Sequence, residues 1–300
     1  MRLGLKIDVD TLGGFREGVP ALLEVLGRRG VPASFYVSLG PDNSGRAIFR
    51  VFRQEGFLEK MLRTRAPSVY GLRTMFYGTL LPAPLIGPAA PGILPGVVAA
   101  GHEVGLHGFD HVRWHDRLVK MGFGEVAREI DAAQESFRAA LGRPAAGFAA
   151  PGWQSTAVSR AVLAARRFRY ASDTRGEGPY WPRFGAEQSS LLELPTTLPT
   201  LDELLGLQGC RAADFFRLVL NRLNPKKPQV LTIHAELEGG PFLADFARFL
   251  DMAGDRGATF FRLGDWAEEL LQAPGALPVC NVAMGRLPGR AGRVACQVTA

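Results

Sequence analysis

The sequence predicts an α/β fold, a distorted (β/α)7-type barrel with a basic and apolar insertion after the second strand. Two observations predict this class. Apolar stretches of strand length alternate with longer amphipathic stretches along most of the chain, as they do where helices connect the strands of a parallel sheet. Polar residues also follow directly after several expected strands, which is where the catalytic residues of β/α barrels lie.

One large catalytic domain accounts for most of the chain. Its 300 residues are 47% hydrophobic and 21% charged, a composition that suffices for a buried core. We expect the catalytic domain to span residues 1–271. Residues 272–300 are rich in Gly and Pro and are expected to form a loosely held tail.

A strand–helix–strand unit opens the chain. Residues 3–9 alternate like a strand, residues 17–29 carry apolar side chains at helical spacing, and residues 33–39 form a second apolar strand. Gly30 fits the C-terminal cap of the helix. This order predicts two parallel strands joined by a helix.

Residues 41–96 interrupt the alternation and are expected to form an insertion with one or two helices. Residues 46–75 hold seven basic residues against two acidic ones, nearly the whole excess behind the formal net charge of +6. Such a segment favours a phosphate-bearing partner: nucleic acid, an anionic membrane surface or an anionic substrate. The basic residues are Arg46, Arg50, Arg53, Lys60, Arg63, Arg65 and Arg73.

The alternation returns at residue 102 and continues to residue 271. The expected strands are residues 102–107, 145–149, 168–172, 191–194, 229–234 and 259–262. The expected helices are residues 123–141, 155–167, 212–223, 242–254 and 263–271.

Asp8 and Asp10 are candidate site residues at the end of the first strand. The period of two in a strand points both carboxylates to the same side. Like charges this close repel, so the pair requires a cation or a shared proton. The alternative is a strand end followed by an Asx-type turn into Thr11.

His107 and His111 follow another expected strand. On a helical turn, a spacing of four residues places two imidazoles side by side, within reach of one metal ion. Together with Asp10 they would form a mixed nitrogen and oxygen site with open positions, the form that catalytic metals take. The alternative is a pair of surface histidines, and His102 and His115 are expected to be ordinary polar groups.

His234 and Asp173 also end expected strands. His234 is a candidate for proton transfer, the alternative being a satisfied polar group, and Asp173 is either its hydrogen-bond partner or a turn residue. With Asp8 as the base and His234 as the acid, these residues favour metal-assisted amide hydrolysis. The sequence has no GxSxG elbow and no GxxxxGK[ST] loop, which disfavours serine-type acyl transfer and P-loop phosphoryl transfer.

The same stretches resemble the motifs of the polysaccharide deacetylase family, also called the NodB-homology fold, over roughly residues 3–270. The resemblance implies Asp8 as the catalytic base and His234 as the catalytic acid. It also implies one divalent metal ion (zinc, cobalt or manganese) bound by Asp10, His107 and His111. The stretches that carry the resemblance are residues 7–10, 107–111, 150–153, 173 and 231–234.

Two positions depart from the pattern of this family. Val9 separates Asp8 from Asp10, and the Arg that the family usually carries near Ala149 is absent. We expect Arg175 to replace that Arg in steadying Asp8.

Longer stretches resemble one branch of the family: IDVDT, SLGPDNSGR, HEVGLHGFDH, SDTRG, LPTTLPTLDE and TIHAE. That branch removes the N-formyl group of undecaprenyl-phosphate-linked 4-deoxy-4-formamido-L-arabinose in the lipid A modification that confers polymyxin resistance. The resemblance implies a polyprenyl-phosphate-linked aminosugar substrate and no nucleic acid partner. One alternative is a deacetylase of another N-acylated sugar or other non-peptide amide. The other is an inactive barrel that binds lipid or nucleic acid without a metal.

The resemblance also implies a cytoplasmic location, peripheral on the anionic inner-membrane surface. The residues agree with this: the first ten, MRLGLKIDVD, lack the apolar run of a signal peptide, and Cys210, Cys280 and Cys296 have no CxxC spacing. We therefore expect free thiols in a reducing compartment.

Overall fold

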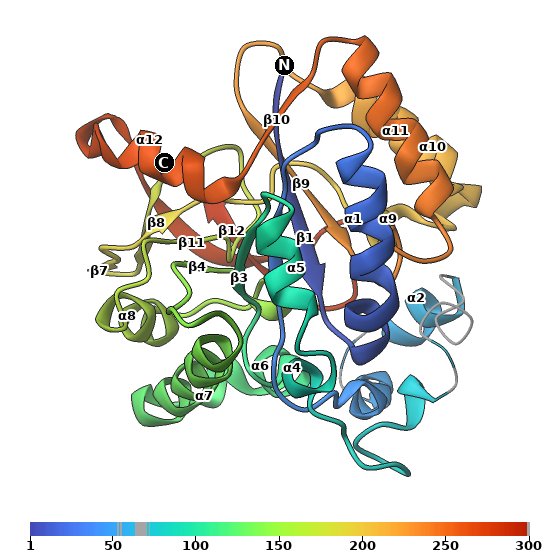
Figure 1. Ribbon diagram of the computed structural model, residues 1–300. Helices are drawn as coiled ribbons and strands as arrows, with labels where there is room; N and C mark the ends of the chain where they lie inside the picture. The colour runs from blue at the N-terminus through green and yellow to red at the C-terminus, as the bar shows by residue number, and fades with distance from the viewer. Residues whose placement is uncertain (53, 55, 64–70, 72, 299–300) are drawn as a thin grey trace.

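The computed structural model describes residues 1–52, 54, 56–63, 71 and 73–298 (Figure 1). Its centre is an eight-stranded sheet with the order β10-β1-β2-β3-β4-β5-β8, in which β9 also pairs with β1. Every pair in this sheet is parallel, which confirms the predicted α/β class with a curled, half-barrel sheet. The strands are β1 (Arg2–Val9), β2 (Ser34–Val37), β3 (Glu103–Leu106), β4 (Gly147–Phe148), β5 (Tyr170–Ala171), β8 (Leu192–Glu193), β9 (Gln229–His234) and β10 (Thr259–Phe261).

Helices surround this sheet (Figure 1). The predicted helices 123–141 and 263–271 are confirmed to the residue, and Gly142 ends the first of them in the left-handed conformation at φ 69°. The helices are α1 (Val19–Gly27), α6 (His111–Arg117), α7 (Phe123–Leu141), α8 (Ala157–Ala165), α9 (Leu201–Leu204), α10 (Ala212–Arg222), α11 (Leu243–Asp255) and α12 (Leu263–Leu271). Short turns of other helix types are η1 (Gly14–Gly18), η4 (Leu118–Lys120), η5 (Pro151–Trp153), η6 (Leu207–Gly209) and η7 (Pro274–Ala276).

The strands β1 and β9 form the most deeply buried part of the sheet. Every residue of β9 is buried, and so is every residue of β1 after Arg2. A strand that is covered on both faces is normally apolar throughout. The buried polar residues Lys6 and Asp8 in β1 are therefore candidates for function, since a buried charge needs a specific partner.

The insertion contains η2 (Ser44–Phe52), α2 (Phe57–Arg63), η3 (Thr74–Phe76), α4 (Ile86–Ala89) and α5 (Ile93–Ala99). These are more numerous and shorter elements than the one or two helices expected there. Two of the basic residues do not face solvent: Arg50 pairs with Asp116, and Arg63 donates hydrogen bonds to backbone carbonyls. Arg53 and Arg65 lie outside the described residues, as does the side chain of Lys60.

The C-terminal residues differ from the loosely held tail that we expected. β11 (Val279–Gly285) and β12 (Val294–Val298) form an antiparallel hairpin. This hairpin joins β6 (Trp181–Phe184) and β7 (Glu187–Gln188) in a four-stranded sheet with the order β12-β11-β6-β7. Of the Gly and Pro residues that suggested a loose chain, Pro288, Gly289 and Gly292 lie in the loop of the hairpin, and most of the others lie in the turn that precedes β11.

Among the described residues, none of the helices has the length and apolarity that a membrane span requires. Cys210, Cys280 and Cys296 are free thiols, as expected.

Candidate active site

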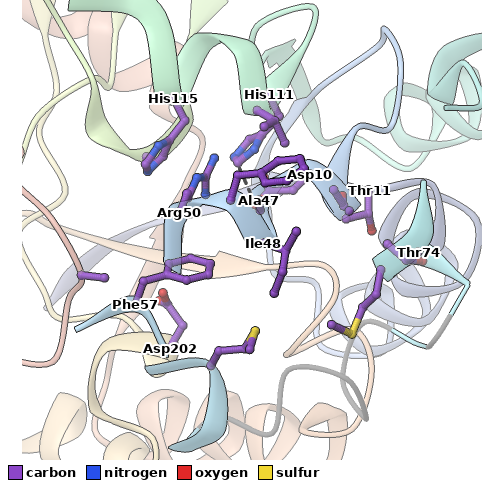
Figure 2. A pocket seen from close by; sticks show the side chains of 18 of the residues that line it. Asp10, Thr11, Ala47, Ile48, Arg50, Phe57, Thr74, His111, His115 and Asp202 are labelled. Carbon is purple, nitrogen blue, oxygen red and sulfur yellow. Dashed lines mark ion pairs between the residues drawn. The ribbon is translucent and has the colours of Figure 1, made fainter. Parts of the chain in front are cut away.

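A cavity of about 630 Å³ opens at the carboxyl ends of β1, β3 and β9. The predicted site residues Asp8, Asp10, His107, His111 and His234 line one side of it. The insertion lines the other side, mostly with apolar side chains, as Figure 2 shows for Ile48 and Phe57. Segments that lie more than two hundred residues apart in the chain therefore meet at one edge of the parallel sheet.

Asp10, His107 and His111 lie close enough together to share one cation. Their ligand atoms all lie within 4.8 Å of one another. His107 Nε2 is 3.2 Å from Asp10 Oδ1, and His111 Nε2 is 3.4 Å from Asp10 Oδ2. The predicted convergence of these three side chains is present in the structure, and it requires contributions from β1, β3 and α6.

His107 and His111 lie close together, but the helical turn from which we predicted this is not what brings them together. α6 begins at His111, so His107 and His111 do not share a helical turn. Gly108, with φ of 75°, turns the chain between β3 and α6, and the two imidazole rings lie 5.3 Å apart. Asp110 fixes the start of α6, because its side chain accepts hydrogen bonds from the backbone N of Arg113 and from Asn43.

The donor atoms of this cluster fit a divalent metal ion. The Nδ1 of His107 lies 2.9 Å from the carbonyl oxygen of Ala149, which only accepts, so Nδ1 carries the hydrogen. The bare Nε2 then faces Asp10 Oδ1, and this buried oxygen has no hydrogen-bond donor among the described residues. A cation between this nitrogen and this oxygen would satisfy both of them. Two imidazole nitrogens and one carboxylate oxygen leave coordination positions open, as catalytic sites do.

Burial affects the protonation of the two ligands differently. It lowers the pKa of His111 to about 4, more strongly than Asp10 raises it, so this imidazole is neutral at pH 7 and offers a lone pair. Burial opposes a charge on Asp10, yet His111 and His107 together lower its pKa below the usual range. Burial lowers the pKa of His107, but Asp8 and Asp10 together raise it above its usual value, so a metal ion that binds this imidazole would displace a proton.

Asp8 is held by Lys6 and not by Arg175. Lys6 Nζ lies 3.4 Å from Asp8 Oδ2 and donates a hydrogen bond to the carbonyl oxygen of Ser172. The prediction for Arg175 is wrong because this side chain pairs with Glu203 instead. Lys6 and Asp8 are two residues apart in β1, so their side chains project from the same face of the strand.

His234 lies opposite Asp8 in the sheet, since the two residues are partners in the register of β1 and β9. The Nδ1 of His234 is buried and has no hydrogen-bond partner among the described residues. The hydrogen bond expected from Asp173 is absent, because Asp173 pairs with Arg160 at 3.2 Å. Asp173 is also not among the described residues that line the cavity, so its predicted catalytic role has no direct contact with the site.

Glu236 supports the site and was not identified from the sequence. Its Oε1 accepts hydrogen bonds from the backbone N of Asp10, the backbone N of Thr11 and the hydroxyl of Thr11. These bonds hold the turn that carries Asp10 into the cavity. The signal in the sequence is that Glu236 ends the stretch TIHAE, which carries part of the resemblance, two positions after His234.

Arg50, His115 and Arg290 also line the cavity and were not predicted as site residues. Arg50 was interpreted as part of a basic segment with a phosphate-bearing partner, His115 as an ordinary polar group and Arg290 as part of the tail. Sequence spacing gives no signal for their meeting, because each comes from a different element.

Comparison with known proteins agrees with this geometry. A family model described as polysaccharide deacetylase matches residues 5–171. A protein of Shewanella sediminis (strain HAW-EB3), named probable 4-deoxy-4-formamido-L-arabinose-phosphoundecaprenol deformylase ArnD, is 40% identical over 238 residues, 79% of this chain and 76% of that protein. A protein of the same name from Wigglesworthia glossinidia brevipalpis is 30% identical over 288 residues, 95% of this chain and 98% of that protein.

A solved structure supports the fold independently of close sequence identity. The crystal structure of a probable polysaccharide deacetylase from Pseudomonas aeruginosa PAO1 matches with a TM-score of 0.63 at 19% identity, over 91% of each chain. The family match, the identity to the two relatives and the shared fold lead to one conclusion. This chain belongs to the polysaccharide deacetylase family.

Proposed function

We propose that this protein is a metal-dependent deformylase that hydrolyses the N-formyl group of undecaprenyl-phosphate-linked 4-deoxy-4-formamido-L-arabinose. The observation that carries the proposal is the cluster of Asp10, His107 and His111 at one side of a cavity whose opposite wall is apolar. The names of the two relatives identify the substrate class. In this proposal the reaction belongs to lipid A modification and to polymyxin resistance.

The side chains around the cluster support hydrolysis of an amide. A divalent ion held by Asp10, His107 and His111 would supply Lewis acidity to the amide carbonyl and lower the pKa of water. Asp8 serves as the base that takes a proton from the attacking water, and Lys6 balances its charge in the buried strand. His234 serves as the acid, because its Nδ1 has no other described partner and the departing nitrogen leaves poorly unless it is protonated.

The apolar wall supports a substrate with a long hydrocarbon chain. The insertion contributes Ile48, Phe49, Phe57, Met61, Met75, Phe76 and Leu80 to the cavity. On the outside, Phe52 is 85% exposed and Leu62 is 68% exposed, which is unusual for side chains of this size. We propose that residues 46–86 receive the polyprenyl chain and bind the anionic inner-membrane surface from the cytoplasmic side.

Release of formate tests the proposed function. We expect purified, metal-loaded protein to release formate from the formamido lipid, and a chelator to abolish the release. Asp8→Asn should lower turnover by about 10²-fold or more while the protein keeps its metal, since a general base contributes that much. Asp255→Asn, at an exposed carboxylate in α11, is the matched control and should retain full turnover.

Two outcomes would contradict the proposal. Formate release that persists in the presence of chelator would rule out the metal-dependent reaction. Hydrolysis of the N-acetyl analogue, with no hydrolysis of the N-formyl lipid, would identify a deacetylase instead.

A further inference from the structure

A second group of charged side chains lies in the same cavity, one turn further along α6 than His111. The ring of His115 lies 6.4 Å from that of His111, centroid to centroid. Asp116 Oδ1 accepts from both His115 Nδ1, at 2.9 Å, and Arg50 Nε, at 2.6 Å. Figure 2 shows the guanidinium of Arg50 beside the imidazole of His115. The insertion therefore places a cation next to the metal-ligand cluster.

The C-terminal hairpin brings another arginine to the cavity. The guanidinium of Arg290 lies 4.4 Å from the centroid of the Trp153 ring, a cation–π distance. Its Nη1 is 3.8 Å from Asp202 Oδ2, which is long for a charged hydrogen bond. Arg290 therefore lines the cavity without the close contact to a carboxylate that Arg50 makes with Asp116.

Both guanidinium groups keep an unused hydrogen-bond donor. The side chains of Arg50 and Arg290 are only 11% and 9% exposed. Arg50 Nη2 and Arg290 Nε are buried and have no acceptor among the described residues. A buried donor without an acceptor is costly, and each guanidinium group has a planar set of donors that matches an anion with several oxygens.

The electrostatics of this part of the cavity favour an anion. Burial lowers the pKa of Arg290, the carboxylates of Asp202 and Glu203 raise it, and the charges of Arg175 and Arg50 lower it. His115 adds no cation, because burial, and after it the charge of Arg50, lowers its pKa to about 3. An anion between the two arginines would satisfy the unused donors and offset the repulsion between like charges.

We infer that Arg50 and Arg290 form a phosphate-binding subsite, which holds the phosphodiester between the sugar and the polyprenyl chain. The inference rests on the proposed function and names the residues that bind one part of its substrate. His115, which shares Asp116 Oδ1 with Arg50, has its ring 6.4 Å from that of the metal ligand His111, a separation comparable to the span of a pyranose ring. The cavity then accommodates the N-acyl group, the sugar ring, the phosphate and the lipid in the order in which they are linked.

Equilibrium binding of simple phosphates tests this subsite without relying on turnover. The probes are geranyl phosphate, inorganic phosphate and geraniol, titrated into metal-loaded protein and into chelator-treated protein so that binding to the metal is recognised. We expect geranyl phosphate to bind both forms of the protein. Arg290→Gln and Arg50→Gln should each weaken its binding by about tenfold, the loss expected for one charge-assisted hydrogen bond.

The control variant is Arg117→Gln, an exposed arginine in the last turn of α6 that is not among the described residues lining the cavity. It should bind geranyl phosphate like the unsubstituted protein. Arg290→Lys should recover part of the affinity, since it keeps the charge but loses the planar donors. Thermal unfolding of each variant identifies those that fail to fold.

The results separate the two proposals. Stronger binding of geranyl phosphate than of inorganic phosphate identifies the headgroup of a lipid as the ligand, and the reverse identifies free phosphate. Equal affinity in folded Arg290→Gln, Arg50→Gln and Arg117→Gln would overturn the subsite, as would binding that chelator abolishes. A protein that binds geranyl phosphate through these arginines but releases no formate would keep the subsite and refute the deformylase.

Discussion

Lys6 and Asp8 project from one face of β1 and meet in a part of the sheet that solvent does not reach. Removing the lysine would leave the buried Asp8 carboxylate with the imidazole of His107, at 4.0 Å, in place of a full cation, which is strongly destabilising. We expect Lys6→Met to lower the melting temperature and to lower the turnover of formate release by more than tenfold. Metal content should remain near that of the unsubstituted protein, because Lys6 binds no ligand of the cluster.

The matched control for Lys6→Met is Lys226→Met, at an exposed lysine between α10 and β9. Melting temperature and turnover should both remain unchanged in this control. Full turnover in Lys6→Met would show that Asp8 does not depend on Lys6.

Residue types and spacing identify some site residues and miss others. Asp10, His107 and His111 follow strands that the sequence predicts correctly, and parallel strands bring their carboxyl ends to one edge. Arg50 was identified only as one of seven basic residues in a segment that favours a phosphate-bearing partner. Arg290 carries no signal, since an arginine far from any motif is normally a surface residue. The partner of a buried charge is also not visible in sequence, as the pairing of Asp173 with Arg160 shows.

Within the short turn η5, Gly152 packs directly against the side chain of His115. Gly152 has a φ of 62°, and a Cβ at this position would lie 1.9 Å from His115 Cδ2. We expect Gly152→Ala to destabilise the protein by about 1–3 kcal/mol, because it adds both backbone strain and a clash. Thermal unfolding measures this effect, and turnover should fall with it because His115 and Trp153 both line the cavity.

The control for this turn is Gly92→Ala, at a position with φ of −81° and nothing within 4 Å of the added Cβ. It should leave the melting temperature unchanged. A fully stable Gly152→Ala would mean that the turn shifts without affecting His115.

The exposed side chains of the insertion give a prediction about membranes. The double variant Phe52→Ser, Leu62→Ser removes two of its most exposed apolar side chains, so we expect weaker co-sedimentation with anionic vesicles. The control is Val119→Ser, Phe123→Ser, whose side chains are 73% and 50% exposed outside the insertion. Equal loss of binding in both double variants would contradict a specific role for the insertion.

Helices and strands whose apolar residues recur at a regular spacing were predictable from the sequence. The helix at residues 123–141 and the strand at residues 229–234 have the predicted bounds, since each has a regular apolar pattern and a clear end. The hairpin of β11 and β12 was not predicted, because most of its residues are at least partly exposed and its strands depend on pairing with β6. The helix at residues 111–117 was missed because polar residues dominate it.

The buried imidazole of His115 makes the free energy of unfolding of the whole protein depend on pH. Burial, and after it the charge of Arg50, lowers its pKa to about 3, against 6.5 in the unfolded chain. Between these values the unfolded chain binds a proton that the folded protein does not bind. Stability contributed by the neutral imidazole is therefore present above pH 6.5 and is lost as the pH falls toward 3.

Urea unfolding of metal-free protein across pH 4 to 8 measures this dependence. His115→Gln should lose part of the slope below pH 6.5, up to about 1.4 kcal/mol per pH unit. Identical slopes in the two proteins would show that the imidazole of His115 is protonated in the folded state.

The cavity is a property of the whole molecule. One side comes from the carboxyl ends of three parallel strands, which the sequence predicts through its strand order. The other side comes from the insertion and the loop of the C-terminal hairpin, whose positions depend on tertiary contacts such as that of Arg63 with the carbonyl oxygen of Gly289. Contacts between segments this far apart in the chain produce no pattern in the local sequence from which they could be predicted.

The position of a bound metal ion shows whether Asp10, His107 and His111 form the metal site. We expect a crystal of zinc-loaded protein to give one anomalous peak within about 2.0–2.2 Å of Asp10, His107 Nε2 and His111 Nε2. His107→Ala should lose this peak. A zinc ion bound elsewhere in the cavity, or no peak at these three side chains in the unsubstituted protein, would contradict the account.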